Sequence, residues 1–363
     1  MSEVAELAAA LVRIDSVNPA LIAGAAGETQ IAEFVAAWLA RAGVEVEVVE
    51  AAPGRPSVIG TARGTGGGAA LLLNAHLDTV GTEAMEAPFD PRVENGRLYG
   101  RGSYDMKGAL AAAMLALADA ARLGLAGDVI LTAVADEEVG SLGTEAVLDR
   151  VTAAAAIVCE PTELQVAVAH RGFAGFEIET HGVAAHGSRP DLGVDAIAKM
   201  GHVLVALERL DRRLQAGRRH PLVGAGSLHA SLIEGGQEFS SYPERCLLTS
   251  ERRTLPGETI EEIEADLRAA AGDADVRLLV TREPFEVDEQ HELVRAVGAV
   301  AGVSGVIGVP FWTDAALVAA AGIPAVLFGP AGEGAHSAVE WVDVSSLERC
   351  RYVYAAVAAA LCA

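Results

Sequence analysis

Three consecutive carboxylates follow an apolar run in the stretch ILTAVADEEVGS, residues 130–141. The run is typical of a buried strand, and Asp136, Glu137 and Glu138 come directly after it. Neighbouring acids repel one another, and each is costly to remove from water. Their position at the end of a strand therefore indicates a bound cation. For Asp136 alone we expect no chemistry, only a loop-end acid that faces water or caps a turn.

Other ligand-type side chains follow further predicted strands or lie in glycine-rich loops. The carboxyl ends of strands in an open α/β sheet face a common crevice, so residues distant in sequence can meet there. Imidazole and carboxylate groups suit zinc, cobalt or manganese, and two histidines with three carboxylates can hold two ions if one acid bridges them. Taken alone, each such residue is more often a solvated surface group than a ligand, and only their common position after strands or in glycine-rich loops favours a metal site. The candidates are His76, Asp78, Asp105, Glu160 and His336.

Helical and strand patterns alternate through the first half of the chain. Apolar residues at helical spacing in 28–43 precede period-two alternation in 44–50, and another helix is expected to begin near Lys107. This alternation predicts an α/β fold with a mostly parallel sheet and helices on both faces. Further strands are expected at 56–64, 69–78, 128–138 and 153–161.

The pattern changes around Arg171, where strands and two amphipathic helices follow in an α+β order. The strand-like segment 323–330 then resembles the first half again. We therefore predict a small domain inserted into a larger one. The predicted boundaries are 1–169 and 285–363 for the two parts of the larger, catalytic domain, and 170–284 for the insertion.

Composition and charge exclude several functions. A formal net charge of -23 leaves no basic surplus for nucleic acid or for an anionic membrane surface. The N-terminal stretch lacks the pattern of a secretory signal, and the four cysteines are scattered, which fits a reducing compartment. We expect a cytoplasmic protein. The glycine cluster at 64–70 lacks the strand, turn and helix of a dinucleotide site, and no P-loop or nucleophile elbow occurs.

Seven motifs resemble, in their order and spacing, those of a family of two-metal hydrolases. They are NAHLDTV, GRGSYDMKGALAA, ADEEVGS, CEPT, HGVAAHGSRP, ERRTLPGE and GEGAHSAVEWV. The family includes acetylornithine deacetylase, succinyl-diaminopimelate desuccinylase, aminoacylase and bacterial glutamate carboxypeptidase. One such motif can occur by chance, whereas seven in series are a specific signal.

The resemblance implies two divalent metal ions, zinc first, with cobalt or manganese as alternatives. It implies that Asp105 bridges the two ions and that the peptide bond after Asp105 is cis. His76 and Glu160 would complete one site, and Glu138 and His336 the other.

The resemblance also implies roles for two acids that do not bind metal. Asp78 would orient the ring of His76 and fix its tautomer. Glu137 would be the general base, which takes a proton from a water activated by the two ions and passes it to the departing amine.

Residues of the inserted domain match further family positions. His186 would donate to the developing oxyanion, in many family members from a partner subunit. Arg253 matches an arginine that binds the substrate carboxylate, and Arg252 beside it is expected on the opposite, solvent-facing side of the strand. Where the family often has a substrate-binding asparagine, this chain has the shorter Ser240. Asp314 is either an active-site residue or the N-cap of an Ala-rich helix.

The predicted function is hydrolysis of the amide bond of an N-acylated amino acid, as in acetylornithine deacetylase. Glu160, in place of an aspartate, favours deacylases and carboxypeptidases over aminotripeptidase-like members. The alternatives are a dipeptidase or carboxypeptidase with the same site and, in another class, an inactive binding protein of the same fold. The expected partners are a small N-acyl amino acid or short peptide and a second copy of the chain, bound through the inserted lid or dimerisation domain.

Overall fold

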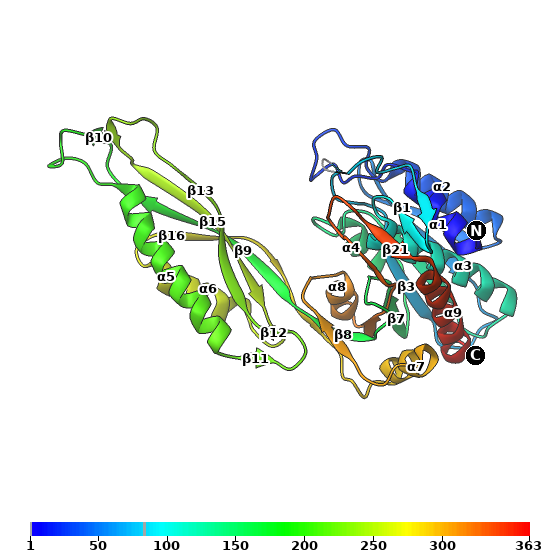
Figure 1. Ribbon diagram of the computed structural model, residues 1–363. Coiled ribbons are helices and arrows are strands. Elements are labelled where there is room, and N and C mark those ends of the chain that lie inside the picture. Colours follow the sequence, from blue (N-terminus) through cyan, green and yellow to red (C-terminus); the bar gives the residue numbers. More distant parts are fainter. Residues whose placement is uncertain (1, 83–84) are drawn as a thin grey trace. The chain divides into compact units, whose positions relative to one another are not determined.

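The computed structural model describes residues 2–82 and 85–363, which form two compact units (Figure 1). The insertion predicted at 170–284 falls within the second of them. Unit 1 consists of the chain up to Val168 together with Val287–Ile307 and Thr313–Ala363, and unit 2 consists of Ala169–Glu286 and Gly308–Trp312.

The main sheet of unit 1 is parallel in its middle. β6 and β7 both run parallel to β3, and β19 runs parallel to β7, whereas β1, β2 and β8 add antiparallel edges. All residues of β3, β6 and β7 are buried, as the continuous apolar runs of a sheet covered on both faces require. The spatial order is β1 (Glu45–Ala52), β2 (Arg55–Ala62), β6 (Val129–Val134), β3 (Leu71–His76), β7 (Ala155–Val158), β19 (Ala325–Leu327) and β8 (Ala167–His170). The last two residues of β8 belong to unit 2, where they pair with β17 (Phe285–Glu286), and β18 (Ile307–Val309) also pairs with β8.

Helices cover both faces of this sheet, which confirms the predicted fold class. Ser57 and Gly60 of β2 point to opposite faces because side chains alternate along a strand. A Cβ at Gly60 would lie 2.7 Å from the side chain of Leu39 in α2, which would have to shift, while a Cβ at Gly143 of α4 would lie 2.5 Å from Ser57. The helices of unit 1 are α1 (Glu3–Val12), α2 (Thr29–Arg41), α3 (Gly108–Leu123), α4 (Leu142–Leu148), α7 (Glu292–Ala301), α8 (Ala315–Ala320) and α9 (Val344–Leu361).

The Ala-rich helix α3 is buried along most of its length, in contact with α1, α9 and the sheet. Its small side chains allow this close packing on several sides. Within the described residues, no helix combines the length and the hydropathy that crossing a membrane requires.

A second, antiparallel sheet in unit 1 was not predicted. Its strands are two or three residues long, too short for a periodicity to be read from the sequence. It brings together the loops that carry Asp105 and His336, because β5 precedes the first loop and β20 and β21 flank the second. The order is β20 (Gly332–Glu333), β21 (Trp341–Asp343), β5 (Arg97–Tyr99) and β4 (Arg92–Glu94).

Unit 2 contains a four-stranded antiparallel sheet with two helices packed against it. Along β9 buried and half-buried residues alternate, and Phe176 and Ile178 pack with Met200, Leu207 and Leu248 in one core. Burying each such side chain contributes about 1.5 to 3 kcal/mol. The sheet order is β13 (Ser227–Gly235), β15 (Arg245–Thr254), β9 (Gly172–His181) and β16 (Asp275–Arg282), and the helices are α5 (Ala196–Ala216) and α6 (Ile260–Ala271).

Two short strand pairs complete unit 2. β10 (Ala185–His186) pairs with β14 (Ser241–Tyr242), and β11 (Arg219–His220) pairs with β12 (Gly224–Ala225). The helix α6 begins at a capping box, in which Thr259 and Glu262 each accept the backbone N–H of the other.

Candidate metal centre

Three parallel strands of unit 1 end side by side and carry three of the predicted ligands. β3 ends at His76, whose Cα pairs with Val134 at the end of β6, and Glu138 follows β6 after a short turn. β7 lies on the other side of β3 and is followed by Glu160. The carboxyl ends of the strands thus bring these side chains to one edge of the sheet.

Asp105 and His336 reach the same place from loops. Asp105 lies in the distorted turn Ser103–Lys107, and its peptide bond to Met106 is cis, which confirms that implication of the resemblance. His336 has a φ of 60°, in the left-handed region that few residues other than glycine adopt.

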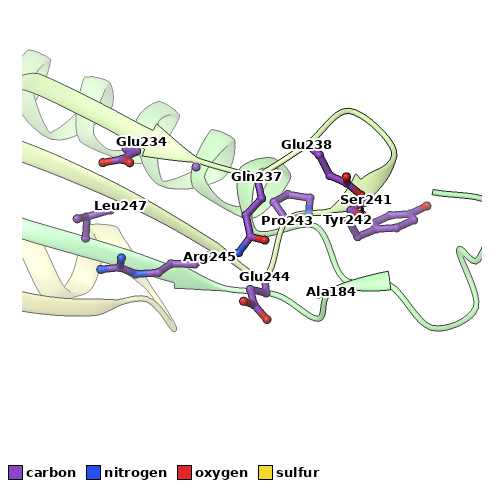
Figure 2. Close-up of a pocket in the computed structure, with 12 residues that line it drawn as sticks. Ala184, Glu234, Gln237, Glu238, Ser241, Tyr242, Pro243, Glu244, Arg245 and Leu247 are labelled. Carbon is purple, nitrogen blue, oxygen red and sulfur yellow. Dashed lines mark hydrogen bonds between the residues drawn. The ribbon is translucent and has the colours of Figure 1, made fainter. Parts of the chain in front are cut away.

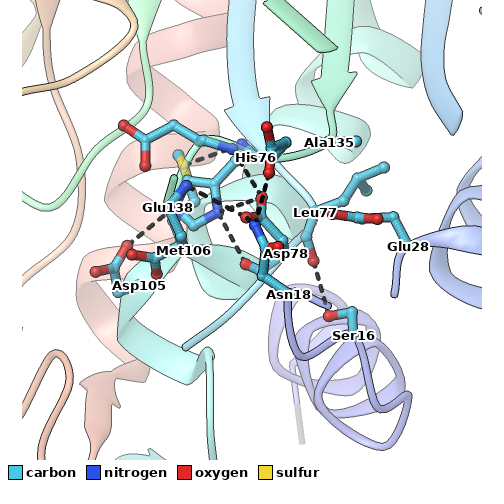
Figure 3. A network of polar contacts seen from close by, with 12 residues as sticks. Ser16, Asn18, Glu28, His76, Leu77, Asp78, Asp105, Met106, Ala135 and Glu138 are labelled. Atoms are coloured by element: carbon cyan, nitrogen blue, oxygen red, sulfur yellow. Dashed lines mark hydrogen bonds and ion pairs between the residues drawn. The ribbon is translucent and has the colours of Figure 1, made fainter. Parts of the chain in front are cut away.

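The five predicted ligands form two groups that share Asp105. His76 Nε2 lies 3.1 Å from Asp105 Oδ1 and 3.9 Å from Glu160 Oε1. His336 Nε2 lies 3.4 Å from the other oxygen of Asp105 and 3.0 Å from Glu138 Oε2. Figure 3 shows His76, Asp105 and Glu138 close together. Each oxygen of Asp105 therefore faces a different histidine, as a bridging carboxylate requires.

The donor set fits divalent cations. Glu138 Oε1 is buried and has no hydrogen-bond partner in the part of the chain that the structure describes. Burial raises the pKa of Glu160 to about 8, and burial and the charge of Glu160 raise the pKa of Glu137 well above its ordinary value. The charge of His76 lowers the pKa of Glu137 and Glu160 but does not offset their burial, and divalent ions would supply further positive charge. Imidazole nitrogen with carboxylate oxygen is the ligand set of zinc and its neighbours.

Asp78 organises this edge of the sheet through both its main chain and its side chain. Its carbonyl oxygen lies 2.9 Å from His76 Nδ1, whereas its carboxylate lies 3.7 Å from that nitrogen. The carbonyl therefore fixes Nδ1 as the protonated nitrogen and leaves Nε2 to face Asp105. The carboxylate accepts the backbone N–H groups of Glu137 and Glu138, at 3.1 and 3.2 Å.

Glu137 lies beside the first group of ligands. One of its carboxylate oxygens is within 4.8 Å of ligand atoms of both His76 and Glu160. Its side chain is half-buried, and its raised pKa gives it a greater affinity for a proton than an ordinary glutamate has.

The expectation that Asp136 faces water is wrong. Asp136 is 3% exposed and has a φ of 70°. Its carboxylate accepts hydrogen bonds from Arg55 Nη2, at 2.7 Å, and from Asn18 Nδ2, at 3.0 Å. Asn18 also donates to Asp78, at 2.7 Å, and Figure 3 shows both residues in this network. No local pattern marks Arg55 or Asn18 as a partner, because both contacts are tertiary.

The capping interpretation of Asp314 is also wrong. Asp314 precedes α8, but its side chain makes no capping hydrogen bond there. It is 1% exposed and accepts the hydroxyl of Thr144 at 2.5 Å. Burial raises its pKa to about 6, which adds another unneutralised acid to the interior of unit 1.

His186 and Ser240 lie close to each other in unit 2. His186 is exposed, and its Nδ1 lies 2.8 Å from the hydroxyl of Ser188. The carbonyl of Ser240 accepts the N–H of Gly187 at 2.6 Å. Figure 2 shows the loop after β13, where the neighbouring Ser241 lines a pocket of unit 2.

Arg253 and Arg252 have different surroundings in unit 2. Arg253 is half-buried, pairs with Glu251 at 2.6 Å and lies over the ring of Phe173. Arg252, expected on the surface, is 2% exposed and pairs with Glu258 at 2.7 Å and Asp266 at 3.0 Å. The two arginines do point to opposite faces of β15. The face that carries Arg252 is buried, however, and Cys246 and Leu248 on that face form part of the unit 2 core.

Sequence comparison supports the family that the motifs indicated. Residues 72–360 match Peptidase family M20/M25/M40. The acetylornithine deacetylase of Myxococcus xanthus is 33% identical over 318 residues, which cover 82% of this chain and 82% of that protein. An N-formyl-4-amino-5-aminomethyl-2-methylpyrimidine deformylase of Bacillus subtilis is 28% identical over 364 residues, covering 87% and 85% of the two chains.

Solved structures share the fold over the whole length. The aminopeptidase PepT of Bacillus cereus has a TM-score of 0.80 at 21% identity, covering 98% of this chain and 97% of its own. A dinuclear metal binding peptidase of the M20 family from Bacillus subtilis has a TM-score of 0.77 at 16% identity, covering 99% and 97%. These likenesses concern the fold alone. With most of its sequence matched and a metal-type site at the sheet edge, this chain belongs to Peptidase family M20/M25/M40, whose members are metal-dependent peptidases and amidohydrolases.

Proposed function

We propose that this chain is a metal-dependent amidohydrolase that removes the acyl group from an N-acylated amino acid. The observation that carries the proposal is the pair of ligand groups that share Asp105, with Glu137 beside them. The relatives named acetylornithine deacetylase support this substrate class. The proposed ligands are His76, Asp105, Glu138, Glu160 and His336, and the proposed ions are zinc.

The residues around the proposed metal centre have different roles in the reaction. The bound ions supply a Lewis acid that polarises the amide carbonyl and makes water acidic. Glu137 accepts the proton from the attacking water and delivers it to the nitrogen of the departing amine, so that the amide C–N bond breaks with no net gain of protons by the protein. Asp78 holds the tautomer of His76 through its carbonyl and positions the main chain of Glu137.

Residues of unit 2 are proposed to bind the substrate. Arg253 binds the α-carboxylate, because a guanidinium forms paired hydrogen bonds with a carboxylate. His186 donates to the oxygen of the tetrahedral intermediate. Ser240 stands where the family often has a longer asparagine, so the proposed contact of this residue with the substrate is shorter than in those relatives.

A substrate panel tests this proposal. Purified protein loaded with zinc should hydrolyse N-acetyl amino acids faster than N-succinyl-diaminopimelate, N-formylated aminopyrimidines or dipeptides. The formyl substrate is included because the Bacillus subtilis relative is named as a deformylase. Faster turnover of dipeptides would replace the proposed function by the dipeptidase alternative. Absence of turnover on every substrate, with two ions bound, would leave only an inactive binding protein.

We further propose a homodimer formed through unit 2. β13 is an edge strand of the unit 2 sheet, and Leu232 and Ile233 on it are 72% and 56% exposed. An exposed apolar edge strand is a template for pairing with another chain. Leu232→Arg should therefore convert a dimer to a monomer in light scattering. Leu123→Arg, at an exposed leucine of unit 1, should not.

We propose the cytoplasm as the compartment. All four cysteines are buried and none forms a disulfide. Such thiols persist in a reducing environment. Fractionation of the source cells tests this, and recovery of the protein outside the cytoplasm would contradict it.

A further inference from the structure

Glu340 is a buried carboxylate whose two oxygens both receive hydrogen bonds from one loop. It is 2% exposed. Its Oε1 accepts the backbone N–H groups of Tyr104 and Asp105, at 2.9 and 3.0 Å. Its Oε2 accepts the N–H of Gly102 at 2.9 Å and Arg101 Nη1 at 2.7 Å. One side chain thus binds the loop that carries Asp105 at four points.

Arg101 adds a second link between the same two loops. It is 3% exposed, and besides Glu340 it donates from Nη2 to the carbonyl of Ser337, at 3.0 Å. Ser337 follows His336 directly in the sequence. The guanidinium also balances the charge of Glu340, which makes the burial of that carboxylate less costly. Arg101 therefore connects the loop of Asp105 to the loop of His336 directly beside His336, a proposed ligand.

The loop needs such an acceptor because its own backbone is irregular. Asp105 has φ -118° and ψ 93°, so the turn Ser103–Lys107 does not satisfy its N–H groups as a helix would. Buried N–H groups without an acceptor are costly. Glu340, 235 residues away in the sequence, supplies the acceptor for Asp105.

We infer that Glu340 is a positioning residue for the metal centre, which holds the loop of Asp105 against the loop of His336. His336 Nε2 lies 3.4 Å from Asp105 Oδ2, and the two residues would share one ion. The inference rests on the proposed function, because it takes both residues as ligands. Partners that orient metal ligands typically change metal affinity by about 10- to 100-fold when they are removed.

Glu340→Gln tests the inference with the smallest change of shape. Glutamine keeps one oxygen acceptor but turns the other into an NH2 group, which faces N–H donors in either orientation. We expect the zinc ion of Asp105, Glu138 and His336, two of whose ligand loops Glu340 joins, to bind about 10- to 100-fold more weakly. The ion of His76 and Glu160 shares only Asp105 with that group and should lose less affinity. Titration with chelator-buffered zinc, read as bound metal per chain, measures both affinities without any assay of turnover.

Glu258→Gln is the matched control. Like Glu340, Glu258 accepts a hydrogen bond from a buried arginine and one from a backbone N–H. The donors are Arg252 and the N–H of Leu255, each at 2.7 Å. It lies in unit 2, so this variant should bind both ions with wild-type affinity. Equal loss of affinity in the two variants would show a general effect of destabilisation and would overturn the inference.

Circular dichroism shows whether Glu340→Gln folds. If it does not, Arg101→Lys tests the same inference. Lysine keeps the charge but cannot reach both Glu340 and Ser337 as the guanidinium fork does. We expect a loss of several-fold in affinity for the same ion. A wild-type protein that binds no zinc would refute the proposed function and the inference together. A wild type with two ions and variants with unchanged affinities would refute the inference alone.

Discussion

Arg55 donates a hydrogen bond of 2.7 Å to the carboxylate of Asp136, the residue that precedes the proposed general base. The same guanidinium donates to both oxygens of Glu28, at 2.7 and 2.8 Å, and to Asn18. Asn18 in turn donates to Asp136 and Asp78. One buried cation therefore balances two acids, Glu28 and Asp136, on separate segments and holds the loop after β6 in place.

Arg55→Met should strongly destabilise the protein. Methionine fills similar space but leaves Glu28 and Asp136 buried without their counter-charge, which costs about 3 to 5 kcal/mol. Arg63→Met is the control, because Arg63 is exposed and its pairs with Glu45 and Asp128 are each worth about 0 to 1 kcal/mol. Urea unfolding measures both changes. Similar losses in the two variants would mean that the buried network does not stabilise the fold.

Glu137→Gln should separate catalysis from metal binding. Without a carboxylate to accept the proton, kcat should fall by about 100- to 10,000-fold, while two zinc ions still bind. Because burial and Glu160 raise the pKa of Glu137, removing its charge should also raise the melting temperature of the metal-free protein.

The exposed Glu33→Gln provides the comparison for Glu137→Gln. It should change neither kcat nor melting temperature. A Glu137→Gln variant as active as the wild type would show that Glu137 is not the base. If Glu137→Gln lost both zinc ions, Glu137 would instead be a metal ligand.

The strand pattern predicted the parts of the site that follow the strands. His76, Glu138 and Glu160 come after apolar runs, and the rule that parallel strands end at one edge places them together without further information. The contact between Asn18 and Asp78 has no such local signal, because it depends on how a loop folds back over the sheet.

Arg252 and Glu340 show two other limits of sequence reasoning. Period-two alternation correctly separated Arg252 from Arg253, but it does not reveal that the face of Arg252 is buried. Glu340 lies in a recognised motif, yet its partners lie in a loop with no regular structure and follow strands too short to predict.

Zinc affinity should rise with pH. In the metal-free protein, hydrogen bonds with Asp105 and Glu138 raise the pKa of His336 to about 10, so it holds a proton at about pH 8 that a cation must displace. Calorimetric titration in buffers of different ionisation enthalpy should report proton release on binding. Affinity that does not change between about pH 6 and 9 would contradict this protonation state.

Stability should show opposite pH trends with and without zinc. A raised pKa favours the folded, protonated form, so the contribution of His336 to the metal-free protein is full below its ordinary pKa of 6.5 and is lost as the pH rises through about 10. Bound zinc reverses this trend because deprotonation strengthens ligation. Thermal unfolding across this range, with zinc and with a chelator, measures both. The chelator should also abolish turnover, and added zinc should restore it.

Arg252→Ala and Arg253→Ala should affect stability and substrate binding separately. Arg252→Ala should lower the free energy of unfolding by about 2 to 3 kcal/mol, because it removes charged hydrogen bonds to Glu258 and Asp266 that are largely shielded from water. Arg253→Ala should cost less stability, about 1 kcal/mol or less, because its pair with Glu251 is partly exposed, and should raise KM for an N-acetyl amino acid about tenfold or more. An N-acetyl amine without the α-carboxylate is the control substrate, and its kcat/KM should be the same for the wild type and Arg253→Ala. If the variant loses as much on that amine as on the amino acid, Arg253 acts on something other than the carboxylate.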